Sequence, residues 1–255
     1  MSNILTMAKQ EIREIVAPMK FHSYREYYYR VVNGVVQTFN ILTRHGDCTC
    51  HFGILPLSHV KMRQWDGDFN LNLIDTKLNS NLGQRYRPGL AEELRSLLAY
   101  YDRNNPDTFL PAARKFKIRL EDYLLPLFRN TETPETAYES LRSLSLKRYF
   151  DADESTDFII HFLLMMHRYE EASKQLQAAI ACGEESIRTI WEGYSDQELA
   201  QKNIKDIKFY LTRYNELLDK TEERDAEWLD DWLLDLQRQG LCILKLKEKD
   251  VIRSV

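Results

Sequence analysis

Four side chains that are able to bind a metal lie close together in the sequence, at His45, Cys48, Cys50 and His51. Zinc favours four such ligands in a tetrahedron. The residues around them alternate as in a β-strand, in which side chains two positions apart share a face, so His51 points away from Cys48 and Cys50. The segment also lacks a paired Cys-x-x-Cys knuckle. We therefore expect no metal here and interpret both cysteines as small buried thiols of a strand.

The opening spacing of a calcium-binding loop occurs once, at Asp151, Asp153, Ser155 and Asp157. A complete loop needs glycine at its sixth position and a bidentate glutamate at its twelfth. Thr156 and Phe162 occupy these two positions, so the ligand set is incomplete. The run instead predicts an acidic helix N-terminus, where carboxylates interact favourably with the positive end of the helix dipole.

Histidines could supply acid–base chemistry. His161 and His167 are six residues apart and lie on different faces of a predicted helix, which disfavours a shared metal or proton relay. One of them can cap the helix or lie in the core. His22, His51 and His59 are the candidate acid–base groups of an active site assembled from distant positions. The chain has no Gly-x-Ser-x-Gly, no glycine-rich phosphate loop and no His-Glu-x-x-His, so catalytic residues stay unassigned and no cofactor is expected.

Two runs of tyrosine could stack on nucleic acid bases: Tyr27, Tyr28 and Tyr29, and Tyr100 and Tyr101. Single-strand binding also needs a basic groove, but Arg30 is the only cation directly adjoining either run, and the chain has a net charge of -4. We therefore expect strand packing and no nucleic acid partner. Trp228 and Trp232 are one helical turn apart and could anchor a protein partner, although this spacing on an apolar face favours the core.

The elements that hold these residues begin with an amphipathic helix at residues 3–17, which Pro18 ends. From Tyr27 the apolar period changes to two. Residues 26–32 and 35–44 flank Asn33-Gly34, which predicts a hairpin with a type I′ turn. A third strand at 48–55 follows a turn at Gly46, and two further strands are predicted at 60–65 and 69–74.

Helical spacing returns after a polar stretch at residues 76–84. The predicted helices share a periodic apolar face and lie at 90–104, 116–127, 134–144, 155–167, 169–182, 196–219 and 225–239. Pro134 after Thr133 marks a helix start, and Gly183 is predicted as a helix stop.

These patterns predict an α+β fold with an N-terminal helix, a four- or five-stranded antiparallel sheet and a mostly helical C-terminal half. Hydrophobic residues make up 44% and charged residues 29% of the 255-residue chain, which is typical of a globular protein. We place a boundary in the polar stretch. Residues 1–84 are then a helix-plus-sheet subdomain, and residues 85–255 are a helical subdomain packed against it.

Residues 9–57 resemble an uncharacterised bacterial family, the domain of unknown function numbered forty-three oh four, through the segments 21–30, 35–42 and 51–55. The resemblance covers about a fifth of the chain and implies a similar fold and a bacterial source, but no site residues. Residues 158–182 resemble one tetratricopeptide-type helical hairpin through Tyr169-Glu170-Glu171-Ala172. No 34-residue period repeats elsewhere, so the sequence indicates a single hairpin.

The sequence predicts a cytoplasmic protein without a membrane span. Its opening residues contain charges where an export signal is apolar, and its longest apolar run, 158–166, is about half the ~20 residues of a span. Cys182 and Cys242 are expected to be reduced as well. The leading functional hypothesis is a non-enzymatic interaction or regulatory protein. The alternatives are an enzyme with scattered active residues and a binder of small ligands in a cleft between sheet and helices.

Overall fold

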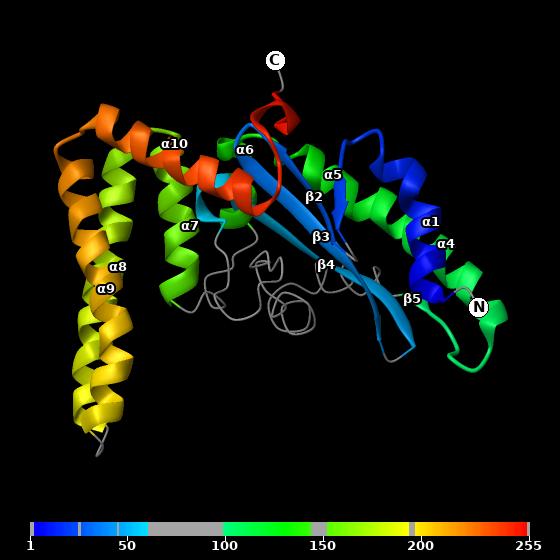
Figure 1. Ribbon diagram of the computed structural model, residues 1–255, viewed down its shortest axis with the longest axis horizontal. Helices are drawn as coiled ribbons and strands as arrows, with labels where there is room; N and C mark the ends of the chain where they lie inside the picture. Colours follow the sequence, from blue (N-terminus) through cyan, green and yellow to red (C-terminus); the bar gives the residue numbers. More distant parts are fainter. Residues whose placement is uncertain are drawn as a thin grey trace.

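The computed structural model describes residues 3–24, 27–44, 46–60, 99–143, 152–193 and 197–253. The strands are β1 (His22–Tyr24), β2 (Tyr27–Val32), β3 (Val35–Arg44), β4 (Asp47–Pro56) and β5 (Ala99–Tyr100). The helices are α1 (Ile4–Val16), α4 (Phe109–Arg119), α5 (Leu125–Arg129), α6 (Pro134–Ser143), α7 (Ala152–Met165), α8 (Tyr169–Gly193), α9 (Gln197–Glu222) and α10 (Ala226–Ile243). Short helical turns are η1 (Leu57–His59), η3 (Pro106–Thr108), the π-helical η4 (Leu120–Leu124) and η5 (Glu248–Asp250). The order of elements confirms the predicted α+β class (Figure 1).

Helix α1 starts and ends where its sequence predicts. The Asn3 side chain accepts a hydrogen bond from the Thr6 amide at 2.9 Å, which satisfies one amide of the first turn. Its apolar stripe is buried, and the helix packs on β3 and α4. Helix α6 also begins at its predicted signal, with Pro134 first and the Thr133 hydroxyl accepting from the Thr136 amide.

The described strands form one antiparallel sheet in the order β1-β2-β3-β4-β5. Asn33 and Gly34 both have positive φ, 48° and 79°, which is the backbone of a type I′ turn and confirms the first predicted hairpin. In register, Val32 pairs with Val35. Of the strand predicted at 60–65 only Val60 is described, and it follows η1 outside any strand. The rest of it, the strand predicted at 69–74 and the predicted boundary at residue 84 lie outside the described part.

Two parts of the predicted pattern need correction at the sheet edges. β1 pairs with β2 although no strand was predicted there. Ala99 and Tyr100 form β5 and pair with Cys48 and Asp47, although the sequence predicts a helix through residue 104. Pairing with the edge of β4 supplies backbone hydrogen bonds to residues 99 and 100. These long-range bonds outweigh the local preference for a helix that the apolar period indicates.

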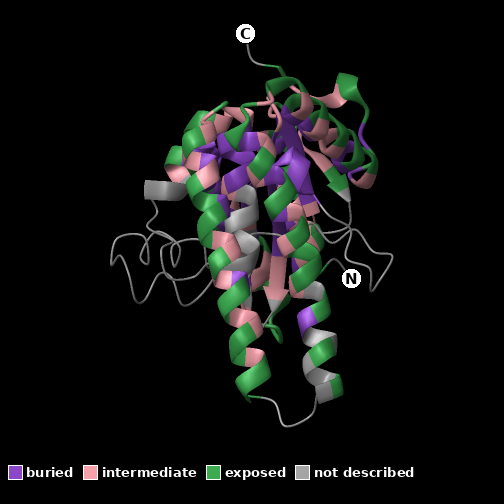
Figure 2. Cartoon of the chain, turned by 90° about the vertical axis from the view of Figure 1, so that its left-hand side faces the viewer, coloured by how far each residue is buried: buried purple, intermediate pink, exposed green. Residues whose placement is uncertain are grey.

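The sheet is covered on both faces. On one face Phe39 stacks on Tyr28 with ring centroids 4.8 Å apart and packs with residues of α1, α4 and α5. On the other face Val31 and Val36 pack with Leu244 and neighbouring residues that follow α10. Figure 2 shows buried residues gathered in the body around the sheet, whereas the surface of α8 and α9 is mostly exposed or half-buried.

Helices α8 and α9 lie side by side and project well beyond α7, while α10 crosses from their upper end toward the sheet (Figure 1). The prediction that Gly183 ends a helix is wrong, since α8 continues to Gly193. A Cβ atom at Gly183 would lie 2.7 Å from Leu211 Cδ2. Gly183 therefore allows α8 and α9 to approach closely within a longer helix. Within the described parts of the chain, none of the helices combines the length and apolar character that crossing a bilayer requires.

Candidate functional site

His161 lies in a buried junction of η1, α7 and α10. Its Nδ1 is 2.8 Å from the hydroxyl oxygen of Ser58, and both residues are buried. Its ring meets the His59 ring edge-on at 5.5 Å and the Trp232 ring at 5.1 Å. The expectation that one histidine of the pair lies in the core is confirmed. The structure also brings together Ser58, His59 and Trp232, which the sequence analysis did not connect.

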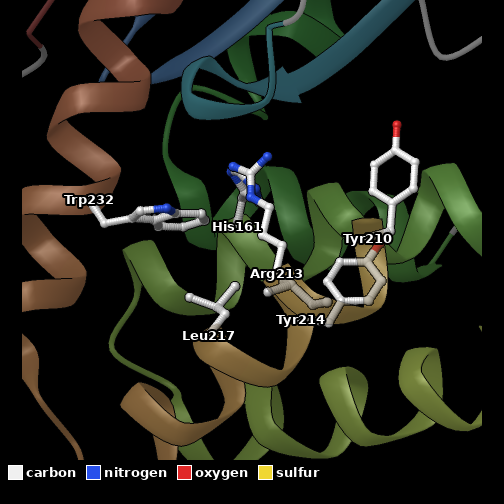
Figure 3. A pocket seen from close by; sticks show the side chains of 7 residues that line it. His161, Tyr210, Arg213, Tyr214, Leu217 and Trp232 are labelled. Carbon is white, nitrogen blue, oxygen red and sulfur yellow. The ribbon is translucent and has the colours of Figure 1, made fainter. Parts of the chain in front are cut away.

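The space beside this junction is too small for a substrate. His161 and Trp232 line a cavity of about 10 Å³ together with residues of α9. Figure 3 shows the side chains that line it. A cavity of this size holds about one water molecule. The Ser58–His161 hydrogen bond therefore acts as a buried link between η1 and α7, which are far apart in the sequence.

Tyr210 of the cavity lining is exposed, and Phe209 lies directly before it on α9 as a second exposed aromatic residue. We define the aromatic–arginine surface as Phe209, Tyr210 and Arg213 of α9 with Trp232 of α10. Phe209 is 67% exposed and Tyr210 is 43% exposed. Their rings lie 5.8 Å apart, and the Arg213 guanidinium lies 5.5 Å from the Trp232 ring centroid. Figure 3 shows Arg213 reaching from α9 toward His161 and Trp232.

Helix α9 places Phe209 away from its own packing seam. Ile204, Tyr214 and Leu217 are buried, and Leu211 packs against Gly183 of α8. These positions follow a period of three and four, and Phe209 does not belong to it. Packing between α8 and α9 therefore leaves Phe209 exposed. The missed signal in the sequence was a large aromatic residue outside the apolar stripe of a long helix.

Within four positions of Phe209, α9 carries three cationic residues and one acidic residue, Asp206. Lys205 is exposed one helical turn before Phe209, and Lys208 is exposed directly before it. Arg213 follows one turn later. No ion pair of either lysine lies within the residues that the structure describes. Trp228 stacks on Trp232 with ring centroids 6.3 Å apart, and both are half-buried against the core. The prediction that these tryptophans pack in the core is confirmed in part, since each contacts the core but stays partly exposed.

Cys48 and Cys50 are buried thiols on the same face of β4, as predicted. Burial raises the pKa of Cys48 to about 12, and burial, followed by the neighbouring Cys48, also raises the pKa of Cys50. Within the described residues no three histidine, cysteine or acidic side chains gather in a way that could hold a metal ion. His45 and the side chain of His51 lie outside that part.

Iodoacetamide is expected to alkylate Cys242 in the folded protein at about pH 8 and to leave Cys48 and Cys50 unmodified. Cys242 is exposed, whereas burial shields the other two thiols and keeps Cys48 protonated. Peptide mass spectrometry after a timed reaction measures this difference. The same reaction in urea is the control, since all three thiols should then react. Alkylation of Cys48 as fast as Cys242 in the folded state would contradict the structure.

The remaining predicted site residues occupy separate places. His22 is half-buried and stacks on Tyr29 at 5.8 Å, whereas His167 is exposed and its Nδ1 lies 2.7 Å from the Tyr169 hydroxyl. The calcium-like spacing falls at the start of α7, where residues 152–157 are helical, and Asp151 lies outside the described residues. Its backbone therefore matches the predicted helix N-terminus, which begins at Ala152 instead of Ser155.

The tyrosine runs differ from each other. Tyr28 and Tyr29 are buried in the sheet, which confirms the strand packing predicted for the first run. In the second run, Tyr101 is half-buried and its hydroxyl donates to the Thr43 carbonyl at 3.3 Å. Tyr100 is 70% exposed on β5 and does not pack as predicted.

Comparisons with protein-family models, with curated proteins and with solved structures find no match to this chain. The resemblance of residues 9–57 to the domain of unknown function numbered forty-three oh four therefore stays a prediction.

Proposed function

We propose that this protein is a non-enzymatic interaction module that binds another protein through the aromatic–arginine surface. The observation that carries the proposal is the exposure of Phe209 and Tyr210 beside Arg213 and Trp232. Tryptophan, tyrosine and arginine are the residues most enriched among those that dominate binding energy at protein interfaces. Phe209 and Tyr210 are exposed at the protein surface, where they can pack against an apolar side chain of the partner.

The partner chemistry follows from the charges of the same helix. Three cations, Lys205, Lys208 and Arg213, outnumber the single carboxylate of Asp206 within four positions of Phe209. The partner segment should therefore carry an apolar anchor flanked by carboxylates. Burial of two aromatic rings against that anchor supplies most of the affinity, and the charges set orientation and the rate of association. The cavity beside His161 is too small for a small-molecule substrate, which favours a protein surface as the ligand at this place.

The test is a quantitative co-purification of the tagged full chain from the cells that express it naturally. We expect one stoichiometric partner with the wild type and its loss with Phe209→Ala. A truncated hot-spot residue costs about 2 kcal/mol or more, which is about a thirtyfold rise in Kd. The purified partner should show this change by calorimetry. Tyr100→Ala is the matched control, since Tyr100 is equally exposed but lies on β5.

Two results would count against this function. One is a wild-type chain that elutes as a clean monomer under gentle conditions. The other is a partner whose Kd is the same for the wild type, Phe209→Ala and Tyr100→Ala. A partner without an acidic segment would leave the binding surface supported but contradict the predicted charge of the partner. A Kd that does not change with salt concentration would contradict that charge as well.

A further inference from the structure

A groove of about 480 Å³ lies between the β2–β3 turn, the second half of α10 and the segment after η5. Its volume is in the range of sites that hold small organic ligands. Apolar lining comes from Leu234, Leu241 and Val251, and charged lining comes from Arg238, Arg253 and Glu248. It is separate from the aromatic–arginine surface, with which it shares none of its lining residues.

Backbone hydrogen bonds fix the walls of the groove. The Asn33 amide donates to the Ile252 carbonyl at 2.9 Å, and the Ile252 amide donates to the Val31 carbonyl at 2.8 Å. These bonds hold Ile252 beside β2, and the next residue, Arg253, lines the groove together with Arg238 of α10. The Leu57 amide donates to the Gly34 carbonyl at 2.8 Å and ties η1 to the β2–β3 turn. The groove is thus part of the fold, and its arginines are presented by ordered backbone.

The two guanidiniums of the groove are available to a ligand. Neither Arg238 nor Arg253 forms an ion pair or a side-chain hydrogen bond with another residue in the part of the chain that the structure describes. Both are exposed, while Leu241 is buried and Leu234 is 41% exposed in the same groove. The lining therefore combines unpaired cations with an accessible apolar wall. Two arginines and one glutamate leave a single net positive charge.

We propose that this groove binds a small organic monoanion with an apolar body, such as an aromatic or medium-chain carboxylate. Guanidinium groups bind carboxylates through paired, charge-assisted hydrogen bonds, and Leu234, Leu241 and Val251 contact the apolar body. Glu248 disfavours a second negative charge on the ligand, because it would lie in the same groove. The inference does not depend on the protein-binding function proposed above.

The test is calorimetric titration of the full chain with 2-naphthoate, with octanoate, and with 2-naphthalenemethanol as the neutral analogue. We expect both carboxylates to bind at least about tenfold more tightly than the alcohol. Arg238→Gln and Arg253→Gln should each weaken carboxylate binding by about tenfold, and Arg103→Gln, an exposed arginine elsewhere, should leave it unchanged. Glu248→Gln should strengthen it by up to about fivefold, because a nearby like charge is removed.

The outcomes separate specific binding from general adhesion to apolar surface. No heat from either carboxylate at millimolar concentration would overturn the proposal. Equal affinity for the alcohol, or equal loss in the Arg103→Gln control, would also overturn it. All four substitutions lie at exposed positions, so unchanged thermal unfolding is expected and shows that each variant is folded.

Discussion

Replacing Gln37 by leucine is expected to lower the free energy of unfolding by about 3–5 kcal/mol. Gln37 is fully buried on β3. Its amide nitrogen donates to the carbonyl oxygens of Phe128 and Thr131 at 2.5 and 2.9 Å, and its oxygen accepts from Arg30 Nε at 2.8 Å. Leucine has nearly the same size but offers no hydrogen bond. Arg30 Nε and the Thr131 carbonyl would each lose the partner that Gln37 provides, and the Phe128 carbonyl would keep its bonds from Thr131. Several buried polar groups lose a hydrogen bond at once, which is why the expected loss is large.

The hydrogen bonds of Gln37 belong to a network that includes the buried charge of Arg30, and this charge makes the network sensitive to substitution. Arg30 is 4% exposed and pairs with Glu132 at 2.7 Å, while its guanidinium lies 5.2 Å from the Phe21 ring centroid. Burial lowers the pKa of Arg30, and the Glu132 carboxylate opposes this effect. The charge is therefore held in the core by all of its partners acting together.

Urea unfolding monitored by circular dichroism measures the loss in Gln37→Leu. Arg30→Met combined with Gln37→Leu is the informative second variant, because it removes the buried charge as well as its partner. The double variant should be less destabilised than the sum of the two single changes. A loss below about 1 kcal/mol in Gln37→Leu would show that the network contributes little to stability.

The second large effect is expected for Gly240→Ala, which should lower the free energy of unfolding by about 2–3 kcal/mol. A Cβ atom there would lie 2.4 Å from the carbonyl oxygen of Leu57. This neighbour is backbone, so it cannot move aside as a side chain can. Alanine favours a helix over glycine by about 1 kcal/mol, and the clash outweighs this gain. The change would displace α10 from η1 and with it the junction of Ser58 and His161.

Two other glycines of the long helices provide the controls. Gly193→Ala should leave stability nearly unchanged, since nothing lies within 4 Å of its Cβ position. Gly183→Ala should give an intermediate loss, because the close neighbour is the flexible end of Leu211. Thermal unfolding of the three variants under one condition gives the order. Equal stability of Gly240→Ala and Gly193→Ala would show that α10 does not approach η1 as closely as the structure has it.

Local sequence determined where several elements begin and turn. Asn3 caps α1, Asn33 and Gly34 form the first hairpin turn, and Pro134 starts α6, all at their predicted positions. Each of these signals acts between residues at most four positions apart, so it can be recognised without knowledge of the tertiary contacts. The apolar period also indicated the buried face of α10 and part of that of α9, where Tyr214 and Leu217 are buried but Tyr210 is exposed.

Only the tertiary structure decided which distant residues meet. β5 formed because β4 offered an edge, Gly183 lies inside a helix because α9 passes close by, and His161 meets Ser58 across 103 positions of the chain. The exposure of Phe209, and the presence of both Arg238 and Arg253 in one groove, were likewise decided by tertiary packing. A side-chain period identifies an apolar face, but it carries no information on which segment covers that face, because covering depends on packing between elements far apart in sequence.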